Sequence, residues 1–135
     1  SNMWTILTFT FFAFFAAQVF ANNNDAIKKT IEDQIAALKL DDFETAFGFA
    51  TPFLKEKFGS AEKFGKMVRN GYPMVWRPSK VIFLGNERYH HGLAQVVQIV
   101  DAKGKSHYLR YYMIEFDGLW RIGGVEFLPA SAFSV

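Results

Sequence analysis

The sequence predicts an α+β fold in which N-terminal helices pack on a four-stranded antiparallel sheet. Helical periodicity is confined to the first half of the chain, and strand-type patterns follow it. None of the later strand-like segments is followed by a long helix that could return the chain in parallel. The chain has 135 residues, half of them hydrophobic, and 15 Lys+Arg against 13 Asp+Glu, which is typical of one globular domain.

The N-terminal segment differs in composition from the rest of the chain. Residues 1–2 precede Met3 and are typical of a tag remnant, so they are set aside. Residues 3–21 are almost entirely apolar, and the first charged residue is Asp25. This pattern is typical of a signal peptide that is cleaved after the small residue Ala21. The sequence therefore predicts a periplasmic or secreted protein with a single domain over residues 22–135.

An uncleaved membrane anchor is the alternative for the same segment. No Lys or Arg follows Met3, whereas Lys28 and Lys29 lie on the other side of the apolar run. Trp4 to Ala21 is close to the roughly 20 residues that cross a bilayer. A buried helix is the third interpretation.

Four helices are predicted before the first strand. The first carries an apolar stripe at helical spacing, formed by Ile27, Ile31, Ile35 and Leu38. Asp41 and Glu44 resemble a capping box at the start of the second helix, which ends at Thr51-Pro52.

Local capping signals delimit the next two helices. Thr51 is predicted to cap a short third helix, with Pro52 in its first turn and Gly59 at its end. Ser60 is predicted to cap a fourth helix that closes at Gly71.

The second half of the chain predicts a meander. Residues 72–78 are bounded by prolines and predicted to be extended, and residues 85–92 are predicted to form a loop. The Asp117-Gly118 pair is a strong hairpin signal, and Gly123-Gly124 indicates a bulge or bend. The predicted strands are Lys80–Leu84, Leu93–Val100, His107–Phe116 and Leu119–Phe127.

The order of these elements resembles the nuclear-transport-factor-2-like superfamily, which has a cystatin-like, cone-shaped α+β fold. The resemblance covers about residues 25–127 and includes the ending Asp117-Gly118-Leu119-Trp120-Arg121-Ile122. The chain is also similar to a bacterial family catalogued as domain of unknown function 4864. The residues that carry this second similarity are Asp41-Asp42-Phe43, Ala46 to Pro52, Phe58-Gly59-Ser60, Phe64, Met67-Val68, Tyr72-Pro73 and Trp76-Arg77-Pro78.

The resemblance implies a strongly curved sheet that wraps the first helix and leaves an apolar pocket at the open end of the cone. Relatives use such a pocket for isomerisation, dehydration or ligand binding, and others simply dimerise. The resemblance implies no single activity. By analogy with related folds that pair their sheets, a homodimer is expected.

Metal and cofactor sites are not predicted. The chain contains no cysteine, which excludes disulfides, thiolate nucleophiles and cysteine-based metal sites. His90 and His91 are adjacent, so in an extended chain their side chains point to opposite faces and cannot both hold one ion. We expect a solvated hairpin pair there.

No catalytic motif is present, so the sequence leaves open whether the protein is an enzyme. The weak catalytic candidates are His107, Tyr111 and Glu115, because they share one face of a predicted strand. Facing inward, they would place an acid and a phenol near a histidine in an apolar pocket, as proton transfer requires. A structural or solvent-facing role is the competing interpretation.

Aromatic residues are abundant and mostly predicted to fill the core. A few are candidates for lining a pocket for an apolar or aromatic ligand. These ligand-binding candidates are Tyr72, Met74, Trp76, Tyr111 and Trp120.

One side of the domain is predicted to be basic although the net charge is only +2. Lys63, Lys66 and Arg69 fall on one helical face, which could meet an anionic surface, although a solvated face is the preferred interpretation. No recognition motif for nucleic acid accompanies them.

Three functions remain. The leading prediction is binding of a small apolar or aromatic molecule in the cone pocket. The alternatives are a cofactor-independent lyase or isomerase that uses a pocket acid or histidine, and a homodimeric protein-interaction module. An apolar cavity without a buried acid favours the first, and a filled cone favours the third.

Overall fold

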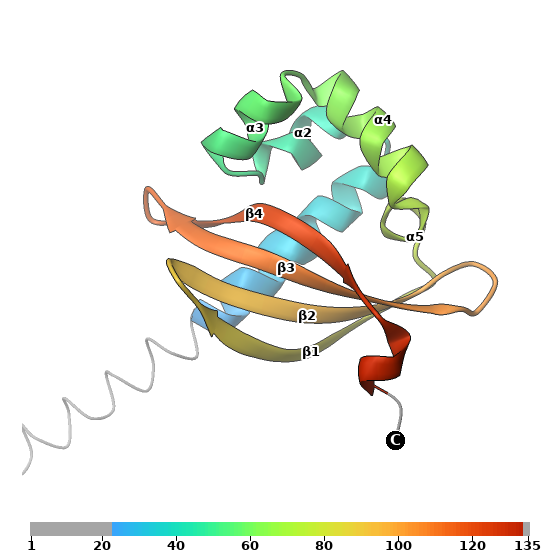
Figure 1. Ribbon diagram of the computed structural model, residues 1–135. Helices are drawn as coiled ribbons and strands as arrows, with labels where there is room; N and C mark the ends of the chain where they lie inside the picture. Colours follow the sequence, from blue (N-terminus) through green and yellow to red (C-terminus); the bar gives the residue numbers. More distant parts are fainter. Residues whose placement is uncertain (1–22, 134–135) are drawn as a thin grey trace, which may run out of the picture.

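The predicted fold class is confirmed: helices pack against a four-stranded antiparallel sheet (Figure 1). The computed structural model describes residues 23–133. A first helix covers residues 23–39 of this range. The elements that follow are α2 (Phe43–Gly48), α3 (Pro52–Phe58), α4 (Ala61–Gly71), α5 (Pro73–Trp76), β1 (Lys80–Tyr89), β2 (Gly92–Val100), β3 (Ser106–Phe116), β4 (Leu119–Leu128) and the 3₁₀ helix η1 (Ala130–Phe133).

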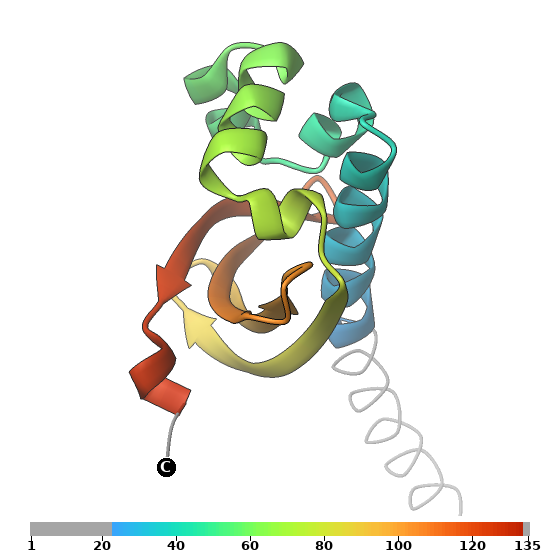
Figure 2. The same cartoon turned by 90° about the vertical axis from the view of Figure 1, so that its right-hand side faces the viewer.

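The first helix lies along the sheet, and the sheet curls strongly beside it (Figure 2). The predicted apolar stripe is confirmed, since Ile27, Ile31, Ile35 and Leu38 are all buried. Thr30 also ties this helix to the sheet, because its hydroxyl donates to the Trp120 carbonyl over 3.0 Å. The sheet therefore has one face packed against helices, as α+β layering requires.

The caps of α3 and α4 are those predicted. The Thr51 hydroxyl accepts a hydrogen bond from the Leu54 amide, and the Ser60 hydroxyl accepts one from Lys63. Gly59 ends α3 with φ at 85°, a conformation that glycine adopts without steric cost.

The predicted cap of α2 is wrong by one residue. Asp42, not Asp41, accepts from the backbone and side chain of Thr45. Asp41 instead adopts φ 57° and accepts hydrogen bonds from the Trp76 indole and the Arg77 guanidinium. The left-handed turn at Asp41 moves the helix start, and an aspartate tolerates this conformation better than most residues.

The extended stretch predicted over residues 72–78 is also wrong. Four of its residues form the short helix α5, so five helices rather than four precede the sheet in the described range. Pro73 stands at the first helical position, where its fixed φ suits a helix and its missing N–H is not needed. Met74 and Val75 are buried by this turn.

The sheet has the strand order β1-β2-β3-β4, which confirms the predicted meander. Asp117 and Gly118 both have positive φ, at 55° and 78°, as the tight hairpin turn between β3 and β4 demands. The register of β3 and β4 shifts opposite Tyr112 and Met113, which leaves Gly123 as the extra residue. The bulge predicted at Gly123-Gly124 is therefore confirmed.

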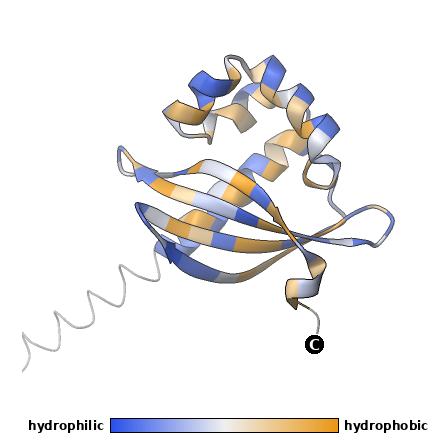
Figure 3. Cartoon of the chain, in the orientation of Figure 1, coloured by the Kyte–Doolittle hydropathy of each residue, from blue (hydrophilic) through white to orange (hydrophobic). Residues whose placement is uncertain are grey.

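The loop predicted over residues 85–92 is wrong, because β1 continues to Tyr89 and only His90 and His91 form the turn. A second bulge lies between Phe83 and Asn86. The buried Gln95 side chain on β2 holds it, since its amide nitrogen donates to the Leu84 carbonyl over 2.8 Å. The hydrophilic residues that suggested a loop are exposed on this end of β1 (Figure 3).

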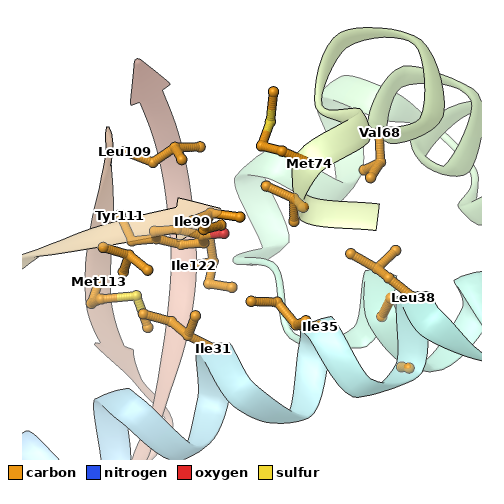
Figure 4. Close-up of a cluster of buried hydrophobic side chains, with 14 of the residues drawn as sticks. Ile31, Ile35, Leu38, Val68, Met74, Ile99, Leu109, Tyr111, Met113 and Ile122 are labelled. Carbon is orange, nitrogen blue, oxygen red and sulfur yellow. The ribbon is translucent and has the colours of Figure 1, made fainter. Parts of the chain in front are cut away.

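The hydrophobic core lies between the first helix, the sheet and α4–α5. Figure 4 shows Ile31 and Ile35 of the first helix facing Tyr111, Met113 and Ile122 of the strands. Among residues 23–133, no helix is long and apolar enough to cross a bilayer. The apolar segment 3–21, predicted as a signal peptide or anchor, lies outside the described residues.

Candidate functional site

A cavity of about 470 Å³ lies between the helices and β4. It is predominantly apolar, and the first helix, α3, α4, α5, β3 and β4 all contribute to it. The lining residues are Gln34, Leu38, Phe53, Leu54, Lys57, Phe58, Phe64, Met67, Val68, Tyr72, Val75, Tyr111, Ile122, Gly123, Gly124 and Val125. Its volume falls in the range of pockets that hold small organic molecules.

Contacts between aromatic rings hold the helical wall of the cavity together. The Phe64 ring of α4 lies 5.4 Å from the Phe47 ring and 5.8 Å from the Phe58 ring, measured between centroids. Phe64 itself is buried. Phe53, in contrast, is 76% exposed although it lines the cavity, so α3 presents an apolar ring at the opening.

The helical layer and β4 are joined by backbone hydrogen bonds beside the cavity. The Ile122 amide donates to the Phe49 carbonyl over 2.8 Å, and the Thr51 amide donates to the Ile122 carbonyl over 2.9 Å. Arg121 adds a hydrogen bond to the Gly48 carbonyl. The cavity lies directly after this junction, where the bulge at Gly123 interrupts β4.

Tyr72 connects the end of α4 to the second half of β4. Its ring stacks on Phe127 with centroids 4.8 Å apart and planes 9° from parallel. Its hydroxyl donates to the Val125 carbonyl over 3.3 Å. Tyr72 therefore forms one side of the cavity, and both its ring and its hydroxyl contact β4.

Tyr111 is a buried residue of the cavity whose polar group the described part of the chain leaves without a partner. Only 1% of the residue is exposed, and its hydroxyl has no hydrogen-bond partner within the described residues. Burial raises the pKa of this phenol strongly, and the neighbouring Tyr72 raises it further. Tyr111 is therefore a neutral hydroxyl that retains an unused donor at neutral pH.

Two other polar side chains line the cavity. Gln34 is buried on the first helix, and its amide nitrogen donates to the Ala46 carbonyl over 3.1 Å. Lys57 of α3 is exposed and is the only charged side chain among the lining residues. No Asp, Glu or His belongs to this lining set.

The three catalytic candidates are not brought together. Tyr111 lies in the cavity, whereas Glu115 is exposed near the end of β3. His107 lies at the other end of β3, where its Nε2 atom is 2.8 Å from the Asp101 carboxylate. His107 and Glu115 are therefore outside the cavity lining, and the trio does not assemble.

The five ligand-binding candidates are also divided. Tyr72 and Tyr111 line the cavity, whereas Met74, Trp76 and Trp120 do not belong to the lining set. Met74 is buried in the core, and the Trp76 indole donates to Asp41 over 2.8 Å. Trp120 packs against the core.

The remaining candidates lie on the surface. His90 and His91 are exposed at the β1–β2 turn, and no group of three or more acidic or histidine side chains in residues 23–133 is placed to hold a metal ion. Lys63 and Lys66 are exposed on α4, but the Arg69 guanidinium lies over the Phe43 ring at 5.0 Å. Arg69 is thus partly engaged by the helical layer.

A separate polar cluster lies on the opposite face of the sheet. Arg110 pairs with Glu126 at 2.6 Å, and the Tyr112 hydroxyl donates to the same carboxylate over 2.5 Å. These two hydrogen bonds, from Tyr112 first and then Arg110, lower the pKa of Glu126. The alternation of β3 therefore assigns Tyr111 to the cavity and its two neighbours to the outer face.

The comparison with known protein families confirms one of the two similarities noted in the sequence. Residues 21–135 match the family model described as Domain of unknown function (DUF4864). The chain belongs to this family. No curated protein matches the chain. In this DUF4864 domain, the matched region includes every residue that lines the cavity.

Sequence reasoning missed several cavity residues of the DUF4864 domain. Gln34 stands between Ile31 and Leu38 inside the apolar stripe, and a polar residue at a stripe position is the signal that could have identified it. Lys57 and Val125 carry no such local signal. They reach the cavity only through the packing of α3 over β4.

Proposed function

We propose that this domain binds a small apolar or aromatic molecule in the cavity between the helices and β4. The observation that carries the proposal is the cavity itself, which combines about 470 Å³ of space, a predominantly apolar lining and an open side. Burying an apolar molecule there would remove apolar surface from water at roughly 25 cal/mol per Å².

The composition of the lining favours binding over proton-transfer chemistry. An isomerase or dehydratase of the kind considered needs a carboxylate or histidine beside the substrate. The two candidates of this kind from the sequence, His107 and Glu115, do not line the cavity. A filled cone, which the interaction-module alternative requires, is also at odds with this cavity.

The first experiment identifies what the domain carries from its own host. Native mass spectrometry of the protein beginning at Asn22 would show a co-purifying small molecule as a mass excess. Binding is then measured by titration with N-phenyl-1-naphthylamine, a neutral fluorescent probe whose emission rises in apolar surroundings.

A matched pair of variants locates the site. Leu54→Trp places a large ring in the cavity from α3, whereas Glu56→Trp adds the same ring at an exposed position of the same helix outside the lining set. We expect at least tenfold weaker probe binding for Leu54→Trp, about 1.4 kcal/mol, and unchanged binding for Glu56→Trp. Equal binding by both variants, or no binding by the wild type, would refute the proposal.

Export and superfamily membership are further proposals. The apolar run of residues 3–21 and the small residue Ala21 support cleavage and export. A long helix beside a curled antiparallel meander supports membership of the nuclear-transport-factor-2-like superfamily. The predicted homodimer stays a prediction, with the oligomeric state in solution as its test.

A further inference from the structure

The Tyr111 hydroxyl is the feature of the cavity that a purely apolar ligand would leave unused. Within the described residues, it is one of two buried side-chain polar atoms without a hydrogen-bond partner, and the other, Nε of Arg110, belongs to the outer face of the sheet. Buried hydroxyls are nearly always hydrogen-bonded, because leaving one unpaired costs roughly 1–3 kcal/mol.

The surroundings of Tyr111 restrict where a partner can come from. Its side chain packs within the hydrophobic core cluster, together with Leu109, Met113 and Ile122. Tyr111 also lines the cavity, so the cavity is the side from which a new group can approach. The neighbouring Tyr72 hydroxyl is already donating to the Val125 carbonyl.

The charges around the cavity determine which acceptor fits. A carboxylate beside Tyr111 would be buried, and the only cation of the lining set, Lys57, lies at the exposed side. An unpaired buried anion is strongly disfavoured, whereas a neutral carbonyl loses much less on leaving water. The phenol remains a donor at neutral pH because burial raises its pKa.

We propose that the ligand of this cavity carries a neutral hydrogen-bond acceptor, a ketone, ester or amide carbonyl on an apolar or aromatic body, and that the Tyr111 hydroxyl binds this acceptor. The proposal rests on the proposed function and adds the chemical class of the ligand. Tyr111 sets specificity, since a hydrocarbon of the same shape leaves its donor unpaired.

The test uses two probes that differ in one group. 2-Acetylnaphthalene carries a carbonyl where 2-ethylnaphthalene carries a methylene group, and both are neutral and of similar shape. Dissociation constants of both probes are measured by protein-observed NMR titration for the wild type, Tyr111→Phe and Tyr108→Phe. Tyr108 is the matched control, because it lies on the same strand but stacks on Phe133 outside the cavity lining.

The informative quantity is the preference for the ketone over the hydrocarbon within each protein, because it cancels the difference in hydrophobicity between the probes. We expect this preference to fall roughly three- to tenfold in Tyr111→Phe and to stay unchanged in Tyr108→Phe. An unchanged preference in Tyr111→Phe, with both probes still bound, would overturn the inference and leave the proposed function standing. If neither probe binds the wild type, the proposed function fails as well.

The stability of the free protein tests independently whether the Tyr111 hydroxyl is unpaired. Removing an unpaired buried hydroxyl leaves no partner behind, so Tyr111→Phe is expected to unfold at the same urea concentration as the wild type or at a higher one. A lower midpoint would show that the hydroxyl has a partner in the free protein, which contradicts the premise.

Discussion

Buried polar side chains of this domain differ in how far the chain itself satisfies them. Gln34 and Gln95 are buried and donate to backbone carbonyls. Tyr111 is equally buried and donates to no described residue. This difference between Tyr111 and the two glutamines is the observation on which the proposed ligand acceptor rests.

Asp101 is one of the carboxyl groups whose ionisation is expected to affect stability at low pH. His107 first, and then the Lys105 amide, lower the pKa of this carboxyl from its ordinary value of 3.8. A lowered pKa means that the stabilisation is complete above about 3.8 and is lost as the pH falls through the lower folded value. We expect a ¹³C-detected titration of Asp101 to have its midpoint below 3.8.

The substitution His107→Phe, which keeps a ring but carries no donor, tests the assigned cause. It removes the ring nitrogen that lies 2.8 Å from the carboxylate but leaves the hydrogen bonds from Lys103 and Lys105 in place. The midpoint of Asp101 should then rise toward its ordinary value without reaching it. A midpoint that does not move would assign the lowered pKa to the backbone amides alone.

Short sequence patterns predicted those residues whose contacts lie within a few positions of them in the chain. Thr51 and Ser60 cap helices because a hydroxyl before a helix accepts from an amide three residues later. Trp76 was expected near a ligand, but its indole reaches Asp41, which is 35 positions away. No short-range pattern contains that contact, and the same applies to Lys57 and Val125 at the cavity.

At the scale of elements, the bulges in β1 and β4 interrupt the regular pairing of the strands. The bulge in β1 lies between Phe83 and Asn86, and Gln95 of the neighbouring strand binds its carbonyls. The sequence around it contains Gly85 and Asn86, which are typical of loops. The strand was therefore predicted to end too early, because the residue that stabilises the bulge lies on another strand.

The β1 bulge is expected to depend on the amide of Gln95. Gln95→Leu removes the donor that contacts Leu84 over 2.8 Å and Val96 over 2.9 Å, and it leaves both carbonyls in place. We expect the free energy of unfolding, measured by urea denaturation, to fall by roughly 1–3 kcal/mol.

Gln98→Leu is the matched control for this prediction. Gln98 lies on the same strand, is half-buried, and donates to the Ser106 hydroxyl over 3.0 Å. Its replacement should cost about 1 kcal/mol or less, because the Ser106 hydroxyl can turn to other partners. Equal losses for the two variants would contradict a special role for Gln95.

At the scale of the whole molecule, stability is distributed unevenly around the cavity. β3 carries Leu109, Tyr111 and Met113, all at most 1% exposed, whereas α3 contains no buried residue. Segments with little buried surface open at lower free energy than the core. The class of fold followed from hydrophobic periodicity, but this asymmetry depends on how α3 packs and was not predictable from its sequence.

Hydrogen exchange should reveal this asymmetry directly. We expect the amides of α3 to exchange at least tenfold faster than those of β3 in the free protein, and saturation of the cavity with a bound ligand to slow α3 in particular. The measurement is hydrogen–deuterium exchange followed by NMR. Uniform protection of α3 and β3 in the free protein would contradict the prediction.

The bulges described for β1 and β4 also bear on how copies of this protein meet. These two strands are the outer strands of the sheet, where unpaired backbone groups could template the addition of a strand from another chain. The regular edge is interrupted by the bulges, by the exposed charged residues Glu87 and Arg88 on β1, and by the contact of β4 with Ala50. We therefore expect that another chain does not readily add a strand to either edge of this sheet.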